Sequence, residues 1–153
     1  WGERVQLFNT SFQQFAEKDI PKYDLIVSNP PFFENSVKVK TVSRELARNS
    51  ENLNIDELFS GVCKVMTEKS IFAIVFPYLR LDELIDVALK NGLSLSRLLK
   101  IKPNPEKSFH RVLAEFTHQN KPFSEDELTI ESMVHHDYSE KYRILTQDFY
   151  LNF

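Results

Sequence analysis

Four consecutive residues, Asn29-Pro30-Pro31-Phe32, directly follow the apolar run at 23–28 and predict a site for methyl transfer to a planar nitrogen. An exocyclic amine such as the N6 of adenine is a poor nucleophile because its lone pair is delocalised into the ring. A protein that methylates it must hold its two N–H groups and draw the nitrogen toward tetrahedral geometry. The Asn29 side-chain oxygen and the Pro30 carbonyl can accept those two hydrogen bonds, and Phe32 offers a stacking face worth about 1–3 kcal/mol per base.

The two prolines make this segment rigid before any substrate arrives. Each fixes its own φ near about −65° and favours an extended conformation in the residue before it, which preorganises the two acceptors. A strand that simply stops at two prolines would explain Pro30 and Pro31 alone. It leaves unexplained the amide before them and the aromatic residues Phe32 and Phe33 after them, at the carboxyl end of a strand, where open α/β sheets bind ligands.

A basic stretch follows this segment. It contains one acid, Glu45, and four cations: Lys38, Lys40, Arg44 and Arg48. Next to a pocket for a base, these side chains and Phe33 are candidates to contact a nucleic-acid substrate. A solvated loop that leads into a helix fits the same charges equally well.

Composition indicates that residues 1–153 form one soluble globular domain or a large piece of one. The chain is 42% hydrophobic and 27% charged, and its net charge of −3 restricts nucleic-acid binding to a local patch. The longest apolar run, at 71–76, is far shorter than the roughly 20 residues of a membrane-spanning helix. No targeting tract is visible, and the single cysteine, Cys63, is expected to be a buried thiol in a reducing cytoplasm.

Hydrophobic periodicity predicts an α/β fold. Helices are expected at 11–17, 53–66, 81–90 and 138–151, and strands at 4–8, 23–28, 71–76, 93–101, 111–117 and 128–133. The alternation of strands and helices predicts a parallel sheet whose strand at 23–28 is covered on both faces. The strands on either side of the Pro103-Asn104-Pro105 turn are expected to form an antiparallel hairpin, and 128–133 a short edge strand.

Two other groups of residues favour structural explanations. His135 and His136 have no cysteine or acid at ligand spacing, so a solvated loop is favoured and no metal is expected. The aromatic residues of the C-terminal segment are expected to form a packed helix face rather than a platform for stacking bases. His110 and Arg111 open a strand, where Arg111 fits an RNA phosphate contact and a structural ion pair equally well.

Several segments together resemble a known family. They are Trp1-Gly2-Glu3-Arg4, Asp24-Leu25-Ile26-Val27-Ser28-Asn29-Pro30-Pro31-Phe32-Phe33, Arg48-Asn49, His110-Arg111-Val112-Leu113, Tyr138-Ser139-Glu140 and Leu145-Thr146-Gln147-Asp148-Phe149-Tyr150-Leu151. The chain resembles class I S-adenosylmethionine-dependent methyltransferases of the Asn-Pro-Pro-aromatic type, and within them the bacterial valine-tRNA adenine-N6-methyltransferases. The resemblance implies methylation of the adenosine 3′ of the anticodon. Protein glutamine methylation, guanine-N2 methylation of ribosomal RNA and a catalytically inactive fragment are the alternatives.

The resemblance also implies a seven-stranded Rossmann-like sheet that is N-terminally truncated here. The cofactor loop and the acid that holds the cofactor ribose would both precede Trp1, so residues 1–153 form a domain without those cofactor-binding strands. Within the chain, the resemblance assigns Ser11, Phe12 and Asn29 to S-adenosylmethionine, with Ser11 in place of the acid that often contacts the adenine amine. The strand at 23–28 is then expected to be an exposed sheet edge that can pair with another chain.

Overall fold

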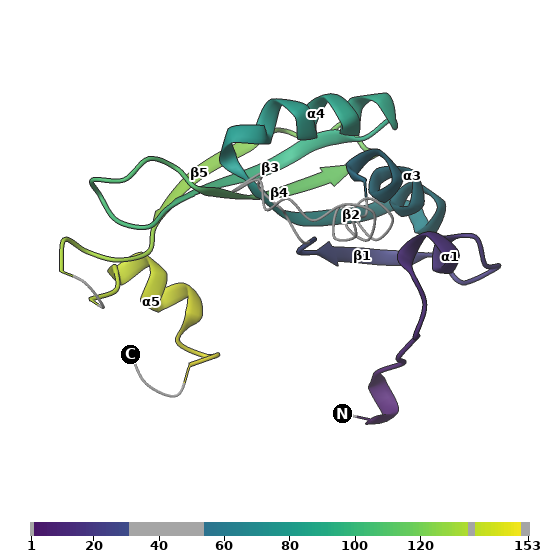
Figure 1. The fold of residues 1–153 in the computed structure, drawn as a ribbon, viewed down its shortest axis with the longest axis horizontal. Helices are drawn as coiled ribbons and strands as arrows, with labels where there is room; N and C mark the ends of the chain where they lie inside the picture. The colour runs from purple at the N-terminus through teal and green to yellow at the C-terminus, as the bar shows by residue number, and fades with distance from the viewer. Residues whose placement is uncertain (1, 31–53, 135–136, 151–153) are drawn as a thin grey trace, which may run out of the picture.

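The computed structural model describes residues 2–30, 54–134 and 137–150, and within them it contains a five-stranded sheet (Figure 1). The strand order is β1-β2-β4-β3-β5. The strands are β1 (Tyr23–Ser28), β2 (Met66–Pro77), β3 (Ser94–Lys102), β4 (Arg111–Thr117) and β5 (Ser124–Thr129). The helices are α1 (Phe12–Ala16), α3 (Ile55–Val65), α4 (Leu81–Lys90) and α5 (Glu140–Thr146), with 3-10 turns η1 (Gly2–Arg4) and η2 (Tyr78–Arg80).

Four of these strands run in one direction and only β4 is reversed. β1 pairs with β2 and β3 pairs with β5 in parallel, whereas β4 pairs with both β2 and β3 in the antiparallel sense. The predicted α/β fold with a late antiparallel hairpin is therefore confirmed. The helix at 81–90 and the strand at 111–117 have the predicted bounds, while the predicted edge strand at 128–133 lies earlier in the chain, as β5.

β2 begins earlier than predicted, directly after α3 ends. Lys69 and Ser70 look like a break in the sequence, but they belong to an irregular stretch in which Tyr23 pairs with Met66 and Leu25 with Ile71. The Ser70 hydroxyl donates a hydrogen bond to the Tyr23 carbonyl at 2.5 Å and accepts one from the Thr67 amide at 2.7 Å. Because this buried hydroxyl satisfies backbone groups inside the bulge, the strand continues through it.

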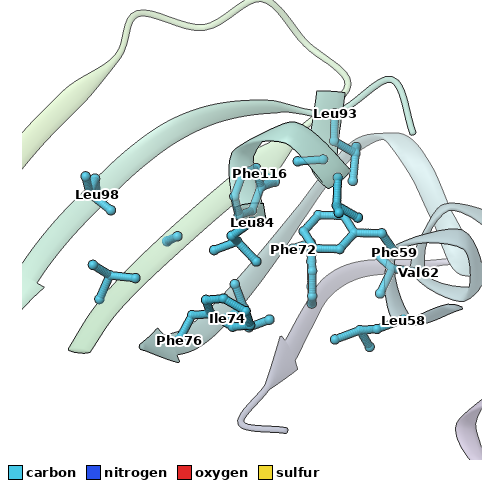
Figure 2. Close-up of a cluster of buried hydrophobic side chains, with 14 of the residues drawn as sticks. Leu58, Phe59, Val62, Phe72, Ile74, Phe76, Leu84, Leu93, Leu98 and Phe116 are labelled. Carbon is cyan, nitrogen blue, oxygen red and sulfur yellow. The ribbon is translucent and has the colours of Figure 1, made fainter. Parts of the chain in front are cut away.

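The hydrophobic core lies on the face of the sheet that α3 and α4 cover (Figures 1 and 2). Phe59 of α3 packs edge-on against Phe72 of β2 and Phe116 of β4, with ring centroids 5.2 and 5.4 Å apart. All three side chains are fully buried. These aromatic contacts fasten the helix layer to the two central strands.

In the described structure, the face of β1 that points away from the core is largely exposed. Leu25 is 60% exposed and Val27 is 71% exposed, so the expectation of a strand covered on both faces is wrong for the described structure. The continuous apolar run reflects a strand with two hydrophobic faces, of which only the face that carries Ile26 packs against the core. β1 also stands at one end of the strand order, as the expected exposed edge.

Two further predicted elements differ from the structure. Residues 4–8 do not form a strand, because no described strand lies beside them to complete a ladder, and Leu7 is 92% exposed. The C-terminal helix is shorter than predicted and buries none of its residues, so a packed helix face is not observed. Its N-cap is Ser139, whose hydroxyl accepts a hydrogen bond from the Tyr142 amide at 3.2 Å.

Gly61 allows α1 to pack closely against α3. A Cβ atom at this position would lie 2.7 Å from the ring of Phe12, which is half-buried against the core. We expect Gly61→Ala to destabilise the protein by about 1 kcal/mol, the middle of the range left when the helix preference of alanine, about 1 kcal/mol, is subtracted from an overpacking cost of about 1–3 kcal/mol. Urea unfolding tests this, with Gly2→Ala as the control, since a Cβ on Gly2 meets no atom within 4 Å. Equal stability of the two variants would contradict it.

Candidate active site

The carboxyl ends of four strands meet at one edge of the sheet. β1, β2, β3 and β5 end there at Ser28, Pro77, Lys102 and Thr129, and the reversed strand β4 begins there at Arg111. The register confirms the alignment, since Arg111 pairs with Pro77 on one side and with Ile101 on the other. Parallel sheets bind ligands at this edge, so the fold places the Asn29 segment where chemistry is expected.

Asn29 is the first residue after β1 and its side chain faces solvent. It is exposed, Pro30 is half-buried, and no described residue forms a hydrogen bond with the Asn29 carboxamide. Ser28 pairs with Ile74, so β2 continues three residues beyond β1, a length of about 10 Å along the strand. The carboxamide oxygen of Asn29 is thus available as an acceptor beside the protruding end of β2.

The remaining predicted substrate residues fall outside the described ranges. They are Pro31, Phe32, Phe33, Lys38, Lys40, Arg44 and Arg48. Their roles stay predictions, and the described part of the predicted catalytic segment consists of Asn29 and Pro30. The same holds for His135 and His136, which also lie outside these ranges.

Ser11 and Phe12 lie apart from Asn29. Ser11 caps α1, and its hydroxyl accepts a hydrogen bond from the Gln14 amide at 3.2 Å. The helix packs near the amino end of β1, where the Phe15 and Tyr23 rings lie 6.3 Å apart, whereas Asn29 follows the carboxyl end (Figure 1). The second lone pair of the Ser11 hydroxyl remains able to accept a bond, and the assignment of both residues to a cofactor stays a prediction.

A second group of side chains at the carboxyl edge was not identified as a site from the sequence. Phe109 is half-buried, with the Tyr78 ring centroid 5.2 Å away and the Lys100 and Lys102 ammonium groups 4.8 and 5.6 Å from its ring centre. The backbone fixes this arrangement, because the Tyr78 amide donates to the His110 carbonyl at 3.1 Å. The only sequence signal was a mixture of basic and aromatic residues just after the Pro103-Asn104-Pro105 turn.

The cations near this edge differ in whether an acid neutralises them. The Lys100 ammonium lies 2.7 Å from Glu125 and 2.9 Å from Glu127 on β5, and these hydrogen bonds raise the pKa of Lys100. Arg80 lies 2.7 Å from Glu83, and its hydrogen bond lowers the pKa of that carboxyl. Neither Lys102 nor Lys107 forms an ion pair with a described residue. The uncompensated positive charge therefore belongs to Lys102 and Lys107.

Other chemistries find no support in the described residues. Within these ranges, no group of three or more His, Cys, Asp or Glu side chains is arranged to hold a metal ion. Cys63 is half-buried, its thiol donates to the Asn91 carbonyl at 3.5 Å, and burial raises its pKa, which disfavours the reactive thiolate. None of the described helices is both long enough and apolar enough to cross a membrane.

Comparison with known proteins gives relatives over the whole chain. The chain is 36% identical over 152 residues to a protein of Bacteroides fragilis and 31% identical over 155 residues to one of Proteus mirabilis, both named tRNA1(Val) (adenine(37)-N6)-methyltransferase. Each match covers 99% of this chain, but the chain spans only 64% and 61% of these two relatives. No protein-family model matches the chain.

Solved structures show the same fold at low sequence identity. A predicted O-methyltransferase of Agrobacterium tumefaciens matches 83% of this chain and 53% of its own, with a TM-score of 0.58 and 13% identity. The sheet, with its one reversed strand, has the class I methyltransferase fold. Within that class, the chain is a homologue of the bacterial proteins named tRNA1(Val) (adenine(37)-N6)-methyltransferase.

Proposed function

We propose that the protein to which this chain belongs transfers a methyl group from S-adenosylmethionine to the N6 amine of adenine in tRNA. The substrate is the adenosine immediately 3′ of the anticodon of valine tRNA. The observation that carries this proposal is the 31–36% identity, over at least 99% of the chain, to proteins named for this reaction. The position of Asn29 at the carboxyl end of β1 supports it, because a pair of acceptors there suits an exocyclic amine.

The residues of this chain act mainly by holding and orienting the flipped base. Asn29 and the Pro30 carbonyl accept the two N–H groups, which draws the nitrogen lone pair out of conjugation and toward the methyl donor. Phe32 stacks on the base. No general base is required, because the amine sheds its proton to solvent after transfer.

S-adenosylmethionine supplies an electrophilic methyl group on a sulfonium. Among the residues of this chain, Ser11, Phe12 and Asn29 are the proposed contacts to it. Phe33, Lys38, Lys40, Arg44 and Arg48 are the proposed contacts to tRNA. We also propose that the reaction takes place in the cytoplasm. Among the described residues, no strand pairs with the outer edge of β1, so we propose that residues 1–153 form one domain and that this domain self-associates along that edge.

Two measurements test the function. We expect calorimetric titration to show that S-adenosylmethionine binds the longer protein, of the full length of its relatives, more tightly than residues 1–153. The longer protein is then expected to transfer labelled methyl groups to valine tRNA, and not to the same tRNA with guanosine in place of the target adenosine. The two RNA substrates differ only in the base that Asn29 would hold.

The alternatives predict other results. If the longer protein methylates a release-factor glutamine and not tRNA, its substrate is a protein. This alternative is chemically reasonable because a glutamine carboxamide carries the same two N–H donors as the adenine amine. Transfer to guanine N2 of ribosomal RNA would redirect the reaction to a different base. Failure of the longer protein to bind the cofactor would leave the Asn29 segment without a methyltransferase role.

A further inference from the structure

The segments that join at the carboxyl edge enclose a groove beside the Asn29 segment. β2 ends at Pro77 and residues 78–80 follow it, while residues 103–110 connect β3 to β4. A cavity of about 550 Å³ lies between them, and we call it the edge groove. Its lining includes Pro77, Leu79, Asn104, Lys107, Phe109 and His110.

The lining of the edge groove combines apolar side chains with a lysine. Leu79 is 92% exposed, an unusual position for a leucine, and it lies with Pro77 and Phe109 on the lining. Lys107 and His110 are exposed on the same lining, and Lys102 approaches the Phe109 ring at 5.6 Å. Glu106, next to Lys107 in the sequence, is exposed, and no ion pair joins it to Lys107 among the described residues.

A nucleotide matches both parts of this surface. Bases and sugars have apolar faces that pack on side chains such as Leu79, and phosphates attract uncompensated lysines. The groove also has a suitable position, because Pro77 lies three residues, or about 10 Å, beyond the level at which Ser28 pairs with Ile74. A nucleotide adjacent to one held at Asn29 would reach it.

We propose that the edge groove binds the RNA nucleotide that flanks the target adenosine, with Lys107 on its phosphate and Leu79 against its base or sugar. This subsite rests on the proposed function, since it requires an RNA substrate at Asn29. It adds a docking contact that does not touch the reacting amine. Its removal should therefore affect substrate affinity and leave the chemical step unchanged.

The test compares Lys107→Glu with Lys121→Glu in the full-length protein. Lys121 is an equally exposed lysine in the connection from β4 to β5, at the opposite edge of the sheet. We expect Lys107→Glu to raise the KM for valine tRNA about tenfold with kcat within twofold, and Lys121→Glu to change neither. For an anticodon stem-loop RNA, Lys107→Glu should also lower the slope of log Kd against log salt by about 0.7, the loss of one phosphate contact.

The outcomes separate this proposal from the proposed function. If the wild type methylates tRNA but Lys107→Glu and Lys121→Glu have the same KM and the same salt dependence, the edge groove is not an RNA subsite. If Lys107→Glu lowers kcat with an unchanged KM, its role is not docking, and the proposal is also wrong. If the wild type binds S-adenosylmethionine but methylates a protein and no RNA, the proposed function itself fails, and the subsite fails with it.

Discussion

Asn29→Ala is expected to reduce the rate of methyl transfer to tRNA about 10²–10³-fold at saturating S-adenosylmethionine. The substitution removes a preorganised acceptor for an N–H group of the target amine, and losing one such group in an active site typically costs this much in kcat. The structure leaves the Asn29 carboxamide exposed at the end of β1 without a hydrogen bond to any described residue, so its removal should not disturb the fold. Single-turnover transfer of a labelled methyl group measures the effect.

Asp24→Ala is the matched control for this experiment. Asp24 is an exposed residue of the same strand, near its amino end and away from the ligand-binding edge. We expect wild-type rates from it, and the same urea unfolding midpoint from both variants. An Asn29→Ala protein that keeps the full rate would remove the main support for the amine-holding role. If Asn29→Ala lowers the urea unfolding midpoint as well as the rate, the effect on the rate is structural.

Phe59→Ala is expected to lower the free energy of unfolding by about 3–5 kcal/mol. Phe59 is fully buried, and its ring contacts Phe72 and Phe116 from the two central strands, so truncation leaves a cavity between the helix layer and the sheet. A loss of this size is a large part of the roughly 5–15 kcal/mol that stabilises a typical domain. Equilibrium unfolding in urea measures it.

Phe123→Ala isolates the contribution of burial. Phe123 is 53% exposed and lies just before β5, outside the buried cluster. We expect its replacement to change the free energy of unfolding by about 0.5 kcal/mol or less. Comparable losses from the two variants would mean that Phe59 does not organise the core as its contacts indicate.

Local sequence signals predicted the bounds of an element correctly where the sequence contains residues that end it. α4 has the predicted bounds because Asn91 and Gly92 end it, and Gly92 adopts a positive φ of 72°. β4 was predicted equally well. Residues 4–8 were assigned wrongly because a strand exists only beside a partner strand, which a local pattern cannot supply. β2 begins earlier than predicted because the Ser70 hydroxyl stabilises a bulge, and the residue types at 66–70 do not indicate that bulge.

One part of the candidate site could be predicted from local sequence and the other could not. The Asn29 segment was predicted because its chemistry lies in consecutive residues at a strand end. The edge groove was not, because it joins residues 77–80 to residues 103–110, and only the pairing of Pro77 and Ile101 with Arg111 brings these segments together. Sites assembled from distant segments require the topology before their residues can be recognised.

The strand order also has a consequence for folding. Strands β2, β4 and β3 come from one continuous stretch, residues 66–117, which also contains α4. That stretch holds every member of the buried cluster except Leu58, Phe59 and Val62. Only the β3–β4 pairing closes a short loop, residues 103–110, whereas β4 reaches β2 across residues 78–110 and β1 reaches β2 across residues 29–65. The β3–β4 hairpin can therefore form first as a local nucleus, whereas β2 and β1, whose carboxyl ends border the candidate site, join the sheet by closing longer loops, so the carboxyl edge is completed late.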